Sequence, residues 1–182
     1  MNFKLNESDI KSLLLSIPGQ RQKEGQKGLY IISRDNPSDS YKIGVSYGRV
    51  GLWGRLKNYK ICFPFLEEFH VKYIITCWDD TDAKSLEKIM LSRTELQRIE
   101  RNPANQGRVS DEYRFVSSNA NLKKAIMKTL NDHPMKWKSV IVFGSNGWRV
   151  YNNQRTADGR RFIQIRALVK PSARTNTMPS IF

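Results

Sequence analysis

The chain has 182 residues and a formal net charge of +14, from 31 Lys and Arg against 17 Asp and Glu. This length predicts one domain with extensions, because a chain of this size supports a single hydrophobic core. No apolar run approaches the roughly 20 residues of a membrane-spanning helix, so we expect a soluble protein. The excess of positive charge attracts polyanions, which makes nucleic acid the first expected partner and acidic lipid or an acidic protein the alternative.

Cysteine and histidine content argues against a disulfide framework or a zinc site. Two cysteines, Cys62 and Cys77, are too few for a disulfide framework. Together with His70 and His133 they also lack the spacing of zinc ligands. We expect both thiols to be buried. The first 20 residues lack the regions of a secretory signal, so the sequence predicts an intracellular protein.

The first half of the chain predicts a helix, a linker and a hairpin. Apolar spacing of three and four predicts a short helix over residues 6–17, followed by a polar linker over residues 20–27. Extended patterns over residues 28–33 and 41–46 surround the turn-forming Asn36-Pro37 pair. These two segments therefore predict an antiparallel hairpin.

Helices and strands alternate through the middle of the chain. Capping residues, proline positions and apolar spacing set their expected bounds. In order we expect a helix over residues 52–59, a strand over 69–78, a helix over 83–99, a short strand or turn over 110–117 and a helix over 119–130.

The C-terminal segment differs in composition from the rest. Residues 134–182 contain nine basic residues and one acidic residue, which is +8 of the net charge. Three strand patterns, over 139–143, 148–151 and 161–169, precede a Ser/Thr/Pro-containing tail over 171–179 that we expect to be mobile. We therefore divide the chain into an N-terminal helix and linker (1–26), an α/β domain (27–133) and a basic β-rich extension (134–182).

Short motifs in a fixed order carry the main functional signal. Gly28-Leu29-Tyr30 is separated by eleven residues from Lys42-Ile43-Gly44, which is followed by Arg55 in the next expected helix and Glu87 in the one after. This arrangement resembles the GIY-YIG endonuclease superfamily over about residues 27–130, in the phage and large DNA virus branch where lysine replaces the second tyrosine. Residues 112–115, Glu-Tyr-Arg-Phe, resemble that branch's Glu-aromatic-Phe element with one extra residue before the phenylalanine.

The resemblance implies an α+β fold, with a three-stranded antiparallel sheet flanked by helices and followed here by a basic β-rich appendage. It also implies a metal-dependent DNA endonuclease. Glu87 would hold one Mg²⁺ or Mn²⁺ ion, whose remaining ligands are water and phosphate. Tyr30 would accept or relay a proton from the attacking water, Arg55 would bind the scissile phosphate, and Lys42 would place a charge near it. Tyr41 replaces the second tyrosine if the register shifts by one residue.

Each of these residues also has an ordinary structural interpretation. Tyrosines in strands commonly pack in the core, and Lys42 and Arg55 could be solvated surface residues. Glu87 is the most informative, because a helical wheel places it among Ala83, Leu86 and Met90. An ionised carboxylate on an apolar face requires a partner, and a metal ion is one.

Two basic segments predict contacts with nucleic acid. Aromatic and cationic residues interleave at Arg49, Trp53 and Lys57, where they could stack on bases and bind phosphates. A second set, suited to anchoring duplex nucleic acid, consists of Arg149, Arg160, Arg161 and Arg166. The alternatives are a solvated helix face for the first and attachment to an acidic protein or a virion assembly for the second.

The leading functional hypothesis is therefore a DNA endonuclease that hydrolyses phosphodiester bonds. A rival of another class is a non-catalytic nucleic-acid-binding or virion-associated structural protein that retains the fold, since fold does not guarantee chemistry. A weaker rival is an RNA-binding accessory protein. Binding weakens with salt in all three, but only the enzyme requires a divalent ion to cut a strand.

Overall fold

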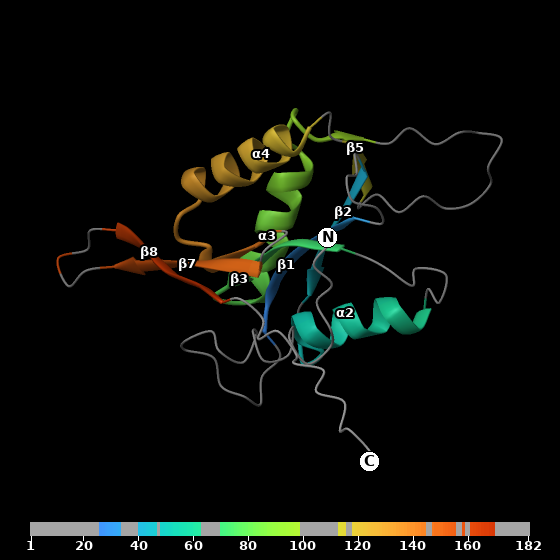
Figure 1. The fold of residues 1–182 in the computed structure, drawn as a ribbon, viewed down its shortest axis with the longest axis horizontal. Helices are drawn as coiled ribbons and strands as arrows, with labels where there is room; N and C mark the ends of the chain where they lie inside the picture. Colours follow the sequence, from blue (N-terminus) through green and yellow to red (C-terminus); the bar gives the residue numbers. More distant parts are fainter. Residues whose placement is uncertain are drawn as a thin grey trace, which may run out of the picture.

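The computed structural model describes residues 26–33, 40–46, 48–62, 70–98, 113–115, 118–144, 147–155, 158 and 161–169. Within these residues the chain forms one antiparallel sheet with three helices (Figure 1), which confirms the α+β class. The helix expected over residues 6–17 and the tail over 171–179 lie outside the described residues.

Every strand pairing in the sheet is antiparallel. Its eight strands are ordered β4-β5-β2-β1-β3-β6-β7-β8. Their bounds are β1 Gly28–Ser33, β2 Ser40–Ser46, β3 His70–Cys77, β4 Gln97–Arg98, β5 Tyr113–Phe115, β6 Trp137–Gly144, β7 Gly147–Arg155 and β8 Arg161–Val169. The expected hairpin and third strand form its centre, β2-β1-β3.

The sheet is wider than the three strands expected. The strands predicted in the C-terminal segment form, but β6 pairs with β3, so that Tyr73 lies opposite Val142. These strands form as expected and continue the central sheet, so the structure does not confirm a distinct β-rich appendage. Alternating side chains predict a strand but not its partner, and here the open edge of β3 supplies the partner.

Three helices lie on the sheet: α2 (Gly51–Cys62), α3 (Asp80–Leu91) and α4 (Asn119–Asp132). Asp79 caps α3 by accepting a hydrogen bond from the amide of Asp82 at 2.8 Å. α3 ends at Leu91, eight residues before the predicted end. Ser92 closes it by donating its hydroxyl to the Ile89 carbonyl at 2.7 Å. The residues after the helix lead into β4, whose pairing with β5 is a contact that apolar spacing does not reveal.

Strand alternation gives the sheet two faces with separate cores. Leu29, Ile31 and Ile75 point to one face and pack with side chains of α3 and α4. On the other face Tyr30, Ile32 and Ile74 pack with Leu52 and Leu56 of α2. Figure 1 shows α2 on the opposite side of the sheet from α3 and α4. We call these the α3/α4 face and the α2 face.

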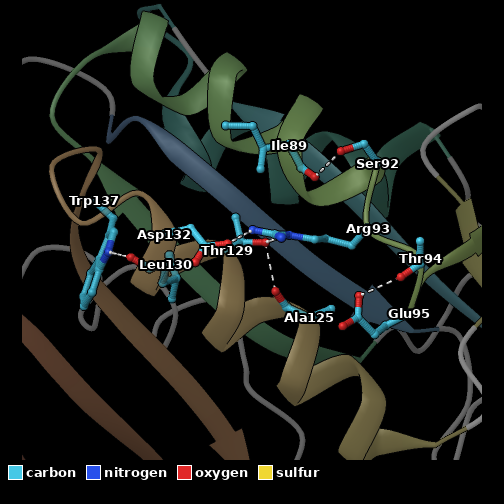
Figure 2. Close-up of polar contacts among 10 residues, drawn as sticks. All are labelled: Ile89, Ser92, Arg93, Thr94, Glu95, Ala125, Thr129, Leu130, Asp132 and Trp137. Atoms are coloured by element: carbon cyan, nitrogen blue, oxygen red, sulfur yellow. Dashed lines mark hydrogen bonds and ion pairs between the residues drawn. The ribbon is translucent and has the colours of Figure 1, made fainter.

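Arg93 fastens the segment after α3 to α4 (Figure 2). Its Nε donates to Thr129 Oγ1 at 3.0 Å, and its Nη2 lies 2.7 Å from Asp132 Oδ2. Thr129 is fully buried and donates its own hydroxyl to the Ala125 carbonyl at 2.9 Å. Its one hydroxyl is therefore used both as donor and as acceptor.

We expect Thr129→Val to lower the free energy of unfolding by about 1 to 3 kcal/mol, because it leaves Arg93 Nε without this buried acceptor. The control is Asp132→Asn, since the Asp132 side chain is 48% exposed and an exposed ion pair contributes about 0 to 1 kcal/mol. Urea denaturation measures both variants. Equal losses would show that the buried hydroxyl is not the stronger contact.

Candidate functional site

The tyrosine of the first motif meets the glycine of the second across the central strand pair. Tyr30 on β1 lies directly opposite Gly44 on β2, and its side chain is fully buried. A Cβ built on Gly44 would lie 2.1 Å from the Tyr30 hydroxyl and 2.4 Å from Cζ. The ring therefore lies over Gly44, and only a residue without a side chain permits this contact.

Gly28, the first residue of the motif, fits β1 against β3 in a similar way. It lies between Ser46 on β2 and Thr76 on β3. A Cβ there would lie 2.0 Å from the Ile75 carbonyl oxygen. Both motif glycines are thus required by close approach, which explains their place in the pattern.

Lys42 is a buried cation on the α2 face. It is 7% exposed, and because Tyr41 and Ile43 point to the α3/α4 face, alternation places Lys42 on the same side as Tyr30. A lysine this buried is uncommon in a sheet, because desolvation disfavours its charge. Its neighbour across the outer strand pair is Tyr113 of β5. Residues 113–115 thus pair with residues 40–42, and Glu112 is outside the described residues.

Arg55 belongs to α2, the helix that covers Tyr30. Its side chain is exposed, between Leu52 and Leu56, which are buried against the sheet. Three predicted site residues, Tyr30, Lys42 and Arg55, therefore lie on the α2 side of the sheet. Arg49 is exposed just before α2, and Trp53 is half-buried against the same core, whereas the Lys57 side chain lies outside the description.

Glu87 is half-buried on α3, next in the chain to the core residue Leu86. Since α3 covers the opposite face, the structure does not place Glu87 on the side of Tyr30, Lys42 and Arg55. The sequence predicted the helix and its position in the chain order. It did not predict which face of the sheet the helix would cover.

Tyr41 also lies on the α3/α4 face. It is fully buried, and its hydroxyl donates a hydrogen bond to Asn119 Oδ1 at the start of α4. Adjacent residues in a strand point to opposite faces, so Tyr41 and Lys42 cannot serve one site together. The observed register therefore gives Tyr41 a packing position between β2 and α4.

The structure offers no multidentate metal centre among its described residues, where no group of three or more His, Cys, Asp or Glu could hold an ion. The aspartates at the start of α3 have other partners. Asp79 caps the helix, Asp80 accepts the Gly48 amide at 3.1 Å, and Asp82 lies 3.3 Å from Lys136 Nζ. An ion held by Glu87 would have to complete its shell with water and phosphate.

Cys77 is not a candidate nucleophile. It is fully buried, as expected, and burial raises the pKa of its thiol, with nearby Asp82 and Asp79 acting in the same direction. The reactive thiolate is therefore scarce near neutral pH. The Cys62 side chain lies outside the described residues.

The C-terminal arginines are only partly described. Arg149 is exposed on β7, and Arg161 and Arg166 occupy positions in β8, whereas Arg160 lies outside the described residues.

Sequence reasoning missed Trp78, which is 54% exposed and has Lys138 Nζ 4.8 Å from its ring centroid. The available signal was a tryptophan at the end of a predicted strand, where side chains reach solvent.

Comparisons of the chain with models of protein families, with curated proteins and with solved structures find no match. Across the described part of the chain, no helix has the length and apolar character needed to cross a membrane.

Gly44→Ala should lower the free energy of unfolding by about 1 to 3 kcal/mol, because its methyl group would collide with the Tyr30 ring. Gly54→Ala is the matched control. Its methyl would meet Cγ1 of Val50 at 2.8 Å, but Val50 is 55% exposed and can move. Alanine also favours a helix over glycine by about 1 kcal/mol, so this control should be neutral or stabilised. Thermal and urea denaturation compare the two, and equal stability would refute the close contact.

Proposed function

We propose that the protein binds nucleic acid and cleaves its phosphodiester bonds, as a GIY-YIG-type endonuclease that depends on a divalent metal ion. The observation that carries this proposal is the contact of Tyr30 with Gly44 beside the buried Lys42. Tyr30 is buried against α2, and Lys42 is buried on the same side of the sheet. A phenol and an ammonium on one side of the sheet, together with Arg55 of α2, are groups that acid–base and electrostatic catalysis of phosphodiester hydrolysis can use.

The three residues of the α2 side suit different parts of phosphodiester hydrolysis. Arg55 is exposed, so its planar guanidinium can bind a phosphate that approaches α2. Lys42 supplies positive charge on the same side, which would stabilise charge on the phosphoryl oxygens. Tyr30, beneath α2, would hold or relay a proton.

A divalent ion, when bound, would neutralise charge on the phosphoryl oxygens. Glu87 is the carboxylate proposed to hold this Mg²⁺ or Mn²⁺ ion. For Glu87 to act with the other three residues, its carboxylate must reach the substrate from the far side of the sheet. The role of Glu87 is therefore tested separately from that of the α2 side.

A second candidate is a nucleic-acid-binding protein that does not cut, including a virion-associated structural protein. The separation of Glu87 from Tyr30, Lys42 and Arg55 by the sheet favours it, as does the complete burial of Tyr30. A binding protein needs exposed positive charge, and Arg49, Arg55 and Arg149 supply it. Duplex DNA is the expected partner in both cases.

Nicking of supercoiled plasmid in Mg²⁺, in Mn²⁺ and in chelator separates the two candidates. We expect metal-dependent nicking by the wild type, and a loss of at least about 100-fold in Tyr30→Phe and Arg55→Gln, the size of effect for acid–base and electrostatic groups. Arg149→Gln removes one charge from β7 and should cut at the wild-type rate at saturating protein. Salt-sensitive binding without nicking in either metal would favour the second candidate.

Glu87→Gln should abolish nicking while leaving duplex affinity within about threefold, since a neutral amide cannot replace a carboxylate as a ligand for a hard cation. Glu95→Gln removes the same charge from the loop after α3 and should leave nicking unchanged. The metal concentration needed for half-maximal nicking is measured for both. Wild-type nicking by Glu87→Gln would exclude Glu87 as the metal ligand.

A further inference from the structure

The outer side of α4 carries positive charge that the α2 side does not explain. Lys123, Lys124 and Lys128 are exposed there, within six residues of one helix. Met127 is exposed among them, at 42%. We call this set of four residues the α4 surface.

These lysines lack the charge partners that exposed helices commonly provide. Lys124 and Lys128 stand four residues apart, where two like charges destabilise a helix. The acid four residues after Lys128 is Asp132, which lies 2.7 Å from Arg93 Nη2. Among the described residues, no ion pair within 4 Å involves the three lysines. Within this part of the chain no ion-pair contact holds these three ammonium groups, so they can approach an external anion.

The carboxylate of Glu95 responds to this field. Its own backbone hydrogen bond lowers the pKa of Glu95, and the charges of Lys128, Lys124 and Arg93 lower it further. Figure 2 shows Glu95 in the loop after α3, on the side of the structure where α4 lies. Glu95 therefore lies close enough to Lys124 and Lys128 to offset part of their charge, and the net charge of these four residues is still positive.

The α4 surface lies on the opposite side of the sheet from α2 (Figure 1). We propose that it is a second binding surface for the phosphate backbone of nucleic acid, so that one molecule bridges two duplex segments. The bridging rests on the proposed nucleic-acid binding by Arg49 and Arg55 on the α2 side. A duplex held by these residues would leave the α4 surface free for another.

Nucleic acid fits the α4 surface better than an acidic protein does. Protein interfaces depend on buried aromatic or apolar anchors, and Met127 is the one large exposed apolar residue described on this helix. From Lys123 to Lys128 the helix rises about 7.5 Å, so the three charges are grouped within little more than one turn. Grouped point charges suit the closely spaced charges of a phosphate backbone.

A capture assay tests the bridging directly. A biotinylated 30-base-pair duplex on beads is saturated with the protein and washed, and a dye-labelled duplex of the same sequence is then added. The wild type should retain the second duplex. The triple variant Lys123→Gln/Lys124→Gln/Lys128→Gln should retain at least about tenfold less, with the slope of log affinity against log salt for the second duplex reduced by about 2 to 3.

Binding of a single duplex in solution distinguishes failure of the proposed function from failure of the bridging proposal. If the wild type binds no duplex, the proposed function fails. If it binds one duplex but captures no second, bridging alone is wrong. The control Arg49→Gln/Arg149→Gln removes exposed charge from elsewhere and should weaken the first binding event. If the triple variant captures the second duplex as well as the wild type does, the α4 surface does not bind nucleic acid. The same conclusion follows if the triple variant no longer binds poly-glutamate, a model of an acidic protein, but still captures the second duplex.

Discussion

The pairing of β1 with β2 is the constraint on which the rest of the structure depends. It places Tyr30 over Gly44, and the same register decides which residues of both strands face α2 and which face α3 and α4. A shift of one residue would exchange the two sets and bury Lys42 in the larger core. The bare backbone of Gly44 therefore fixes the register by shape, since no other position offers the Tyr30 ring the same space.

Local features of the sequence predicted most elements of the fold, but β4 (Gln97–Arg98) lies in residues expected to be helical. Alternation identified β1, β2 and the C-terminal strands, and the aspartates from Asp79 onward marked the start of α3. The width of the sheet was not predictable in this way. Pairing of β3 with β6 joins residues about 65 positions apart, and such contacts depend on the packing of the whole chain. The end of α3 was missed because the following residues join the sheet as β4, and that pairing with β5 is a contact between distant residues.

The candidate site likewise contains residues that local strand pairing places and one, Glu87, whose position depends on the packing of a helix. The motifs predicted a hairpin that carries Tyr30 and Lys42, and its observed register places Tyr30 opposite Gly44 and Lys42 opposite Ile32. The position of Glu87 depends on which face of the sheet α3 covers, and its apolar stripe would pack equally well on either. Sequence spacing could therefore identify a carboxylate on a partly buried helix surface but could not assign it to the α2 face.

Catalysis and bridging require opposite arrangements of charge. An active site must converge on one phosphate, because each group contributes only within about 3 Å of its target. A bridging protein must present separated surfaces, because two duplexes repel each other and cannot share one face. The sheet separates Arg55 from the lysines of α4, and this separation suits the second requirement without help from Glu87. A nuclease with this fold could therefore lose its carboxylate and still hold two nucleic-acid segments together, because its basic surfaces do not depend on the catalytic groups.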